Sequence, residues 1–347
     1  MAKKIVNIGL DVGNFDTKTP LSVTNSGFSK FTKIPFGSDE ALYLDGSWYV
    51  PDAERFPYSR DKTVDDKCFI LSLFGIAKEI MTAVSQTCSN VNQVVEKIEN
   101  VGYVNLGVGL PPAHMMTLND KLISYYKEHF GEHVEFVYYS RTTNGLGEGR
   151  YNFNLKLSNV MVFPQDLTAA LAAAKILRKT KDPEFLTIKF KKAGYYAIDI
   201  GGYTVDVVPI VEGKPQVANC LSLELGVLRL YGEIAKIINQ EFGITLTNEI
   251  IENVLQGTPT VIKEDVISRI NDITTEWVTR IINEIRKMGL EFNAVPVLFL
   301  GGGSALLKTY INKNVIISGC EHSFLTNPKA NAIGYKEYLK KIISSAS

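Results

Sequence analysis

One short pattern occurs twice in this chain, and it constrains the fold more than any other feature. The first copy spans Ile5–Lys18 (IVNIGLDVGNFDTK) and the second spans Tyr195–Ile210 (YYAIDIGGYTVDVVPI). In both copies a run of apolar and β-branched residues reaches an aspartate, is broken by glycine and continues past a threonine. Such runs on either side of a glycine turn predict a β-hairpin. The recurrence about halfway down the chain indicates two halves built on the same plan.

The residues around the two predicted turns indicate phosphate binding. Aspartates precede both turns and follow the second one: Asp11, Asp199 and Asp206. Carboxylate oxygens are ligands for the Mg²⁺ that accompanies a bound phosphate chain, and glycine lets backbone N–H groups approach a ligand closely. A Gly-Gly turn by itself also occurs in purely structural hairpins, so it is the second copy that favours a ligand. We expect the two turns to face each other and to hold one triphosphate between them.

A different glycine-rich segment follows the predicted strand Val295–Leu300. Gly301-Gly302-Gly303-Ser304 leads from that strand into a predicted helix over Ala305–Tyr310. N–H groups at a helix start, with no side chains in the way, suit a flat base or a ribose. The loop Thr143–Gly149 is also rich in glycine, but it matches neither the dinucleotide pattern nor the Walker A pattern. We interpret that loop as a hairpin connection.

Composition narrows the class of protein. The 347 residues suffice for about two domains, and 45% hydrophobic with 21% charged residues is ordinary for a soluble globular protein. Lys+Arg and Asp+Glu balance at 37 each, which argues against a protein that coats nucleic acid by itself. Any role on DNA would therefore need an adaptor protein.

Cysteine usage and the apolar runs indicate a cytoplasmic protein. The four cysteines are far apart and form no C-x-x-C pair, so they predict free thiols in a reducing compartment. The N-terminal apolar run is only about one strand long, which does not fit a signal peptide. No apolar stretch is expected to approach the ~18–20 residues of a membrane span. His129 and His133 have a spacing that could bind metal, but without an evident third ligand they are interpreted as packing or surface residues.

Periodicity predicts alternating strands and helices. Beyond the two hairpins, strands are predicted at Ala41–Leu44, Ser47–Val50, Val104–Leu110, Val134–Tyr139, Tyr151–Leu157, Val160–Phe163 and Gln216–Leu223. Helices are predicted at Phe69–Gln86, Val91–Ile98, Leu118–Phe130, Asp166–Leu177, Leu228–Glu241, Lys263–Lys287 and Ala330–Ile343. The result is an α/β protein.

Five segments stand in an order that resembles a known superfamily, the ATPases related to actin, sugar kinases and heat-shock chaperones. They resemble its first phosphate loop, first connecting helix, second phosphate loop, adenosine loop and second connecting helix: Ile8–Lys18, Val160–Ala172, Ala197–Val207, Leu298–Ser304 and Asn327–Gly334. Within the superfamily the chain is most similar to the ParM-type plasmid-segregation proteins. The motifs that carry this are LDVGNFDTK, VGLPP, VFPQD and IDIGGYTVDVV.

The resemblance implies two actin-like (ribonuclease H-like) domains that flank a central nucleotide cleft. Domain I would comprise residues 1–163 and 328–347, with a small insertion at about 20–66, and domain II residues 164–327. It also implies a polar filament of this chain with itself, hydrolysis of ATP or GTP coupled to polymerisation, Mg²⁺, and an adaptor protein that links the filament to plasmid DNA. No membrane is involved in this interpretation.

The resemblance assigns roles to individual residues. Near Mg²⁺ it places Asp11, Asp199 and Asp206, and along the phosphates it places Gly13, Asn14, Thr17, Lys18, Gly201, Gly202 and Thr204. The nucleoside would lie against Gly301, Gly302, Gly303 and Ser304. The catalytic residues would be Gln165, Asp206 and Asp11.

Gln165 departs from the ParM-type pattern, which often has an acid at this position. A neutral amide orients the attacking water but cannot accept its proton. Phosphoryl transfer depends mainly on positioning and charge stabilisation, so a glutamine is compatible with hydrolysis, and Asp166 is a candidate for assistance.

Other functions of the same fold are less well supported. A sugar or carboxylate kinase is the main alternative, but Asp16 is the only spare acid in the first hairpin and no sugar-pocket signature is evident. A chaperone would need a further substrate-binding domain. A membrane-tethered division protein would need a strongly apolar terminal helix, which Lys329–Ser347 lacks. A scaffold with a degenerate site is disfavoured because the acids and glycines of both turns are present.

Overall fold

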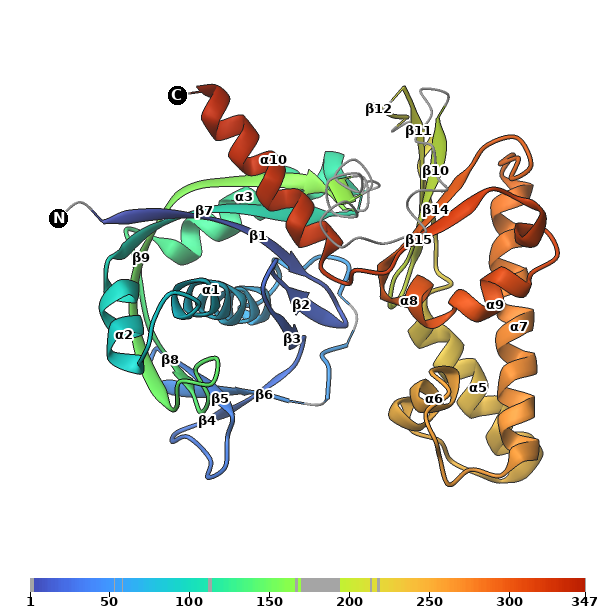
Figure 1. Ribbon diagram of the computed structural model, residues 1–347, viewed down its shortest axis with the longest axis horizontal. Helices are drawn as coiled ribbons and strands as arrows, with labels where there is room; N and C mark the ends of the chain where they lie inside the picture. The colour runs from blue at the N-terminus through green and yellow to red at the C-terminus, as the bar shows by residue number, and fades with distance from the viewer. Residues whose placement is uncertain are drawn as a thin grey trace. The chain divides into compact units, whose positions relative to one another are not determined.

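The computed structural model describes residues 3–52, 54–57, 59–111, 114–165, 168–169, 194–212, 214–216 and 219–346. Internal contacts divide the chain into two compact units (Figure 1). Unit 1 comprises Met1–Ala172 and Lys329–Ser347, and unit 2 comprises Ala173–Pro328. Except for Thr168 and Ala169, the predicted helix Asp166–Leu177 lies outside the described residues.

Unit 1 is built on a nine-stranded mixed sheet with the order β3-β2-β1-β7-β9-β8-β5-β6-β4. Its strands are β1 (Lys4–Val12), β2 (Asp16–Lys18), β3 (Val23–Asn25), β4 (Phe28–Phe31), β5 (Glu40–Leu44), β6 (Ser47–Pro51), β7 (Val101–Leu110), β8 (Val134–Ser140) and β9 (Gly149–Pro164). The three central strands β1, β7 and β9 are parallel, and the other pairs are antiparallel. The predicted hairpin connections at Asp45-Gly46 and Thr143–Gly149 are both confirmed.

Strand β9 differs from the prediction, which had two separate strands, Tyr151–Leu157 and Val160–Phe163. The structure has one strand of 16 residues, antiparallel to β8 in its first half and parallel to β7 in its second. A register shift in the β7 pairing accommodates the extra residue between the two halves. Asn159 donates its side-chain amide to Asn105 at 2.9 Å, and Asn105 donates to Asn7 at 2.8 Å. Because this ladder of amides satisfies the polar residues, the polar stretch does not interrupt the strand.

Four described helices pack in unit 1: α1 (Lys67–Ser85), α2 (Val91–Glu99), α3 (Met115–Phe130) and α10 (Ala330–Ala346). All four were predicted. The sheet curves around α1 (Figure 1), whose residues Leu73, Phe74 and Ile76 are fully buried. The prediction that no stretch approaches the length of a membrane span is wrong, because α1 is long and apolar enough to cross a membrane. However, 78% of its apolar window is buried inside the protein, which is typical of a core helix.

Helix α10 joins the end of the chain to unit 1. Lys336 on this helix forms an ion pair with Glu79 of α1, with 2.6 Å between Nζ and Oε1. The second carboxylate oxygen of Glu79 accepts the backbone N–H of Leu21 at 2.8 Å. A single buried acid therefore connects α1, α10 and the segment that follows β2.

Unit 2 contains a smaller sheet with the order β12-β11-β10-β14-β15, and β13 also pairs with β11. Its strands are β10 (Tyr195–Ile200), β11 (Val205–Val211), β12 (Lys214–Pro215), β13 (Leu221–Leu223), β14 (Val297–Leu300) and β15 (His322–Leu325). Its helices are α5 (Val227–Phe242), α6 (Asn248–Leu255), α7 (Glu264–Lys287), α8 (Gly301–Leu306), α9 (Lys308–Lys313) and a 3₁₀ turn at Ile317–Gly319.

Most of the predicted elements of unit 2 are present, with several differences. The helix after β14 begins at Gly301 and not at Ala305, so the glycines form its first turn. Of the strand predicted over Gln216–Leu223, the last three residues form β13, while residues 217 and 218 lie outside the described residues. Helix α6 and strand β15 were not predicted.

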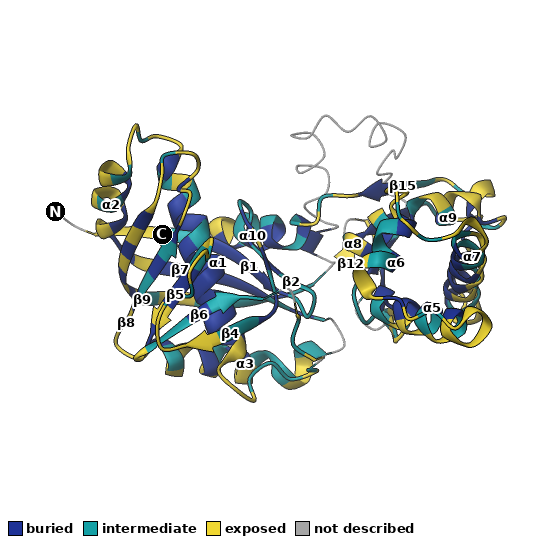
Figure 2. Ribbon diagram, turned by 90° about the horizontal axis from the view of Figure 1, so that it is seen from below, coloured by how far each residue is buried: buried dark blue, intermediate teal, exposed yellow. Residues whose placement is uncertain are grey.

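A layer of helices covers the sheet of unit 2. Helix α7 buries a stripe of residues at three- and four-residue spacing, including Ile270, Ile273, Trp277 and Ile281, while its opposite face is exposed (Figure 2). The indole N–H of Trp277 donates to the carbonyl of Leu225 at 3.1 Å, just before the start of α5. This core therefore fixes the position at which α5 begins.

Candidate functional site

The first predicted turn is confirmed as the connection between β1 and β2. Asp11 lies opposite Lys18 in the strand register, and the turn Gly13–Asp16 lies beyond this pair. Gly13 donates its N–H to the carbonyl of Asp16 at 3.0 Å. A Cβ on Gly13 would lie 2.7 Å from that carbonyl oxygen, so the turn closes this tightly only with glycine at this position.

The second predicted turn repeats this geometry in unit 2. Asp199 of β10 lies opposite Asp206 of β11, and the turn Gly201–Thr204 connects the strands. Gly201 donates its N–H to the carbonyl of Thr204 at 2.9 Å. In both turns an aspartate lies two residues before the glycine that closes the turn. The two sequence copies thus fold into the same local structure.

Helix α5 supports the second turn from behind. Its first N–H groups donate to the turn carbonyls, from Val227 to Gly201 at 3.1 Å and from Leu228 to Gly202 at 2.8 Å. Gly226, the N-cap, donates to the carbonyl of Tyr203 at 2.9 Å. Backbone groups of a helix start therefore hold the carbonyl side of this turn.

Asp199 and Asp206 form a buried pair of acids. Both side chains are more than nine-tenths buried, and Thr204 donates its hydroxyl to Asp206 at 2.9 Å. Burial raises the pKa of Asp206 to about 6, even though hydrogen bonds from Ser222 and Thr204 lower it, and the charge of Asp199 raises it further. A divalent cation would relieve this repulsion, and carboxylate oxygens are the ligands that Mg²⁺ prefers.

The residues present fit a Mg²⁺ ion that keeps part of its coordination for water and phosphate. Within the described ranges there is no group of three or more His, Cys, Asp or Glu side chains that could hold a metal by themselves. Mg²⁺ is commonly bound through one or two carboxylates, together with waters and substrate phosphates. The Asp199–Asp206 pair matches that pattern.

Gln165 lies next to Asp11, although 154 positions separate them in the sequence. The side-chain amide of Gln165 donates to Asp11 Oδ1 at 3.1 Å, and its backbone N–H donates to the carbonyl of Leu110 at 2.8 Å. With its NH₂ group directed at Asp11, Gln165 has its Oε1 as an acceptor for a water molecule. Asp166, the candidate assisting acid, lies outside the described residues.

The other predicted residues of the first hairpin differ in exposure. Thr17 is only 1% exposed, and its hydroxyl lies 3.1 Å from the hydroxyl of Ser26. Ser26 in turn donates to the carbonyl of Gly13 at 2.7 Å. Thr17 therefore supports the turn from within the protein, whereas Asn14 and Lys18 are partly exposed.

The glycines after β14 lie against the second turn. Gly301 has φ +83°, and a Cβ there would lie 1.9 Å from Asp199 Oδ1, so glycine is required at this contact. Gly302 is exposed with open space at its Cβ position, whereas Gly303 and Ser304 are buried. The hydroxyl of Ser304 has no hydrogen-bond partner among the described residues. Gly301 and Gly302 are thus the members of this set that present accessible backbone.

Two cations that the sequence reasoning missed contact the first turn. Lys62 donates from Nζ to the carbonyl of Val12, and burial lowers its pKa while the nearby charge of Asp11 raises it. Arg55 donates from Nε to the carbonyl of Phe15 at 2.8 Å, and its guanidinium lies 3.5 Å from the centre of the Phe15 ring. Both belong to the segment interpreted as an insertion. For Lys62 the only signal was the charged run RDKTVDDK, and such runs are usually solvated. Arg55 lies outside that run.

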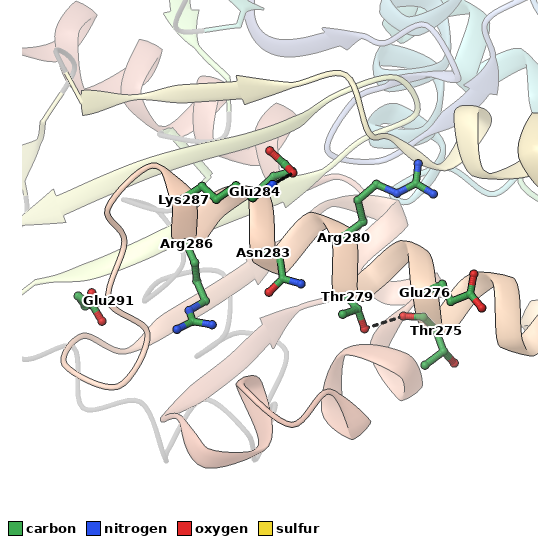
Figure 3. A pocket seen from close by; sticks show the side chains of 9 residues that line it. All are labelled: Thr275, Glu276, Thr279, Arg280, Asn283, Glu284, Arg286, Lys287 and Glu291. Carbon is green, nitrogen blue, oxygen red and sulfur yellow. Dashed lines mark hydrogen bonds and ion pairs between the residues drawn. The ribbon is translucent and has the colours of Figure 1, made fainter.

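A surface hollow of about 740 Å³ lies along α7 (Figure 3), and no predicted site residue lines it. It is lined by Thr275, Glu276, Thr279, Arg280, Asn283, Glu284, Arg286, Lys287 and Glu291. Its acids and bases balance, and Arg280 and Lys287 are already paired with Glu233 and Glu284. This hollow is therefore not assigned a ligand.

Comparison with known proteins identifies the fold. The family model "Archaeal actin homologue MreB-like, C-terminal" matches residues 197–313, which include the second turn and the glycines after β14. The crystal structure of the archaeal actin homologue Ta0583 matches with a TM-score of 0.69 at 19% identity, over 97% of this chain and 99% of that one. This chain has the actin-like fold. No curated protein matches the sequence.

Two further structures extend this likeness to the actin-like proteins. A 15-stranded ParM filament from Clostridium botulinum matches with a TM-score of 0.68 at 18% identity, over 96% of this chain and 99% of that one. The Ta0583 complex with ADP matches with a TM-score of 0.67 at 19% identity, over 97% and 99% of the two chains. The predicted two-domain actin-like α/β fold class is therefore confirmed, and so is the resemblance to actin-like and ParM proteins at the level of the fold.

Proposed function

We propose that this chain is an actin-like ATPase that binds a purine nucleoside triphosphate with Mg²⁺ and polymerises in response. The observation that carries the proposal is the repeated turn, in which an aspartate precedes a glycine that closes onto a carbonyl, once in each unit. One such turn is a common hairpin, but its recurrence with the same spacing in each unit favours a role in phosphate binding. The ADP complex of the archaeal homologue supports a nucleotide as that ligand.

The metal role in this proposal falls to the buried acids. Asp199 and Asp206 would hold Mg²⁺, and Asp11 would lie near the waters of the ion. The ion would neutralise charge on the phosphate oxygens during transfer. Gly301 and Gly302 would lie against the nucleoside, because their backbone is accessible and they adjoin Asp199.

Gln165 would orient the attacking water in the proposed hydrolysis. Its amide donates to Asp11, which fixes the side chain and directs Oε1 to the water. Because a neutral amide does not accept a proton, the proton of the water has to leave to a phosphate oxygen or to solvent. The carboxylate of Asp11 therefore acts by holding Gln165 and by its charge near the metal.

Self-assembly into filaments is proposed from the relatives of the fold. Solved structures with this fold include the ParM filament from Clostridium botulinum and the Alp12 filament. With equal numbers of acidic and basic residues, a role in moving plasmid DNA would work through a DNA-binding adaptor protein. The proposed location of the protein is the cytoplasm.

Sedimentation tests polymerisation and base preference together. The chain would be incubated with Mg²⁺ and ATP, GTP or a non-hydrolysable analogue, and then pelleted over a range of protein concentrations. We expect pelleting above a critical concentration, only with nucleotide, and disassembly as the nucleotide is hydrolysed. A protein that stays in the supernatant at every concentration and phosphorylates a small molecule would instead be a kinase of the same fold.

A further inference from the structure

Side chains from a distant segment hold the carbonyl groups of the first turn. Lys62 donates to the carbonyl of Val12, and Arg55 donates to that of Phe15. Both cations lie in the stretch between β6 and α1, about 40 to 50 residues beyond the turn. Bonds from charged donors to carbonyl groups are stronger than those between neutral groups. Two hydrogen bonds from cationic side chains therefore act on one short turn.

Two further carbonyl groups of the turn, those of Gly13 and Asp16, are also bound by the protein. Ser26 donates its hydroxyl to the carbonyl of Gly13 at 2.7 Å, and Gly13 donates to that of Asp16 at 3.0 Å. By contrast, in the part of the chain that the structure describes, the N–H groups of Asn14 and Phe15 donate to no protein acceptor. A turn with bound carbonyls and unbound N–H groups is suited to an anion.

The segment that carries Lys62 is itself fixed to helix α3. Asp61 accepts from Lys121 of α3, and Tyr125 donates its hydroxyl to the carbonyl of Asp65 at 2.8 Å. Burial raises the pKa of Asp61, but hydrogen bonds from Lys121 and Thr63 outweigh this effect and lower the pKa to about 2. Asp61 is therefore charged at neutral pH, and its ion pair with α3 holds the backbone next to Lys62.

A further contact fixes the end of the same segment. His129 of α3 lies with Nε2 3.1 Å from Asp66, while its Nδ1 lies 2.8 Å from the carbonyl of Tyr125. This supports the predicted packing role of His129. The segment from Asp61 to Asp66 is thus attached to α3 at several points, which limits the positions that Lys62 can reach.

We propose that Lys62 and Arg55 are positioning residues for the terminal phosphates of the bound nucleotide. They hold the carbonyl side of the first turn away from the ligand, so that its N–H groups face the phosphates. Their charges also offset the acids of the hairpin: Lys62 lies near Asp11, and Arg55 lies 3.6 Å from Asp16. An anionic ligand can then approach a turn that carries two carboxylates. This inference rests on the proposed function.

The test is calorimetric titration of the full chain with ADP and, separately, with adenosine. Lys62→Met removes the charge and its hydrogen bond. Lys67→Met is the matched control, because Lys67 begins α1 directly after this segment and pairs with the exposed Asp65 at 2.9 Å. We expect Lys62→Met to weaken ADP binding roughly tenfold to a hundredfold. Adenosine binding should not change, and Lys67→Met should leave both affinities as in the wild type.

Two additional variants guard against a trivial loss of folding. Arg55→Met changes a side chain that is about one-third exposed, and it should also weaken ADP binding while sparing adenosine. Lys62→Arg keeps the cation and should restore most of the lost ADP affinity. In nucleotide-free protein, hydrogen exchange at Gly13, whose N–H donates to the carbonyl of Asp16, should be faster in Lys62→Met than in Lys67→Met.

The outcomes separate this inference from the proposed function. If the wild type binds ADP but Lys62→Met binds it equally well, or loses ADP and adenosine affinity alike, the positioning role is wrong and the proposed function stands. If the wild type binds neither ADP nor ATP, the proposed function is wrong and the positioning role with it.

Discussion

The two turns have the same backbone pattern but different supports. In unit 1, the side chains of Lys62, Ser26 and Arg55 hold turn carbonyls from outside the hairpin. One backbone group adds to them, because the N–H of Ser26 donates to the carbonyl of Phe15 at 3.1 Å. In unit 2 the same task falls to the backbone N–H groups at the start of α5. Equivalent local geometry therefore arises from two unrelated sets of donors.

This difference predicts which substitutions each turn tolerates. Support from side chains is lost through a single substitution far away in the sequence. Support from a helix start does not depend on side chains, except at Gly226, where a Cβ would lie 2.4 Å from the carbonyl carbon of Tyr203. Substitution of a supporting side chain should therefore disturb the first turn, whereas the second turn should be disturbed by a change in the backbone at the start of α5.

The largest expected effect concerns the acid that only the second turn has, Asp206. Asp206→Ala should lower nucleotide hydrolysis by on the order of 100-fold, because the proposed Mg²⁺ site loses one of two carboxylates. Phosphate release measured with saturating ATP and Mg²⁺ checks this. Unchanged turnover would show that the metal is held elsewhere. The second turn would then have no role in metal binding that distinguishes it from the first.

Asp206 should also make the stability of unit 2 depend on pH. Its pKa is about 6 in the folded protein against 3.8 for the ordinary group, so folding favours the protonated form. The contribution of Asp206 to stability is therefore greatest below pH 3.8 and falls as the pH rises through 6. In metal-free protein, Asp206→Asn should raise the free energy of unfolding by about 2–3 kcal/mol at pH 7.5, and much less at pH 4. Urea denaturation at both pH values measures this change in the free energy of unfolding. An equal change at pH 4 and pH 7.5 would contradict the raised pKa of Asp206.

Gly226→Ala tests the backbone support of the second turn. The added methyl group meets the backbone of the turn and should destabilise unit 2 by about 1–3 kcal/mol, with weaker ADP binding. Gly232→Ala is the matched control on the same helix, because its Cβ would meet nothing within 4 Å. That variant should gain up to about 1 kcal/mol from helix propensity. Thermal unfolding compares the melting temperatures of the two variants. Equal changes in melting temperature would argue against a special role for the start of α5.

The smallest expected effect concerns Gln165, next to the first turn. Gln165→Ala should still polymerise but release phosphate about tenfold more slowly, since only the orientation of the water is lost. Stopped-flow detection of phosphate alongside light scattering separates the two steps. Equal release rates would remove Gln165 from the mechanism.

Local sequence sufficed for the features that depend on neighbouring residues. The hairpins, α5 and α7 follow from periodicity and turn residues, and all are present. Helix α6 also had a local signal, since Thr247 accepts a hydrogen bond from the N–H of Ile250 as an N-cap. The local sequence signal for strand β15 was weaker, because its four residues are too few to show a period.

Tertiary contacts explain what could not be predicted. Lys62 and Arg55 lie in a charged loop, and only the folded chain brings them to the carbonyls of Val12 and Phe15. The continuity of β9 likewise depends on amides of Asn105 in β7 and Asn7 in β1. Neither pattern can be read from one segment alone.

The unbroken course of β9 has a mechanical consequence. The strand starts opposite Ser140 at the outer part of the sheet and ends at Pro164, immediately before Gln165. Because hydrogen bonds to β8 and then β7 hold it along its length, its backbone crosses the sheet with no loop between its two halves. A load applied to the far rim of unit 1 would accordingly reach the amide beside Asp11 without passing through any loop.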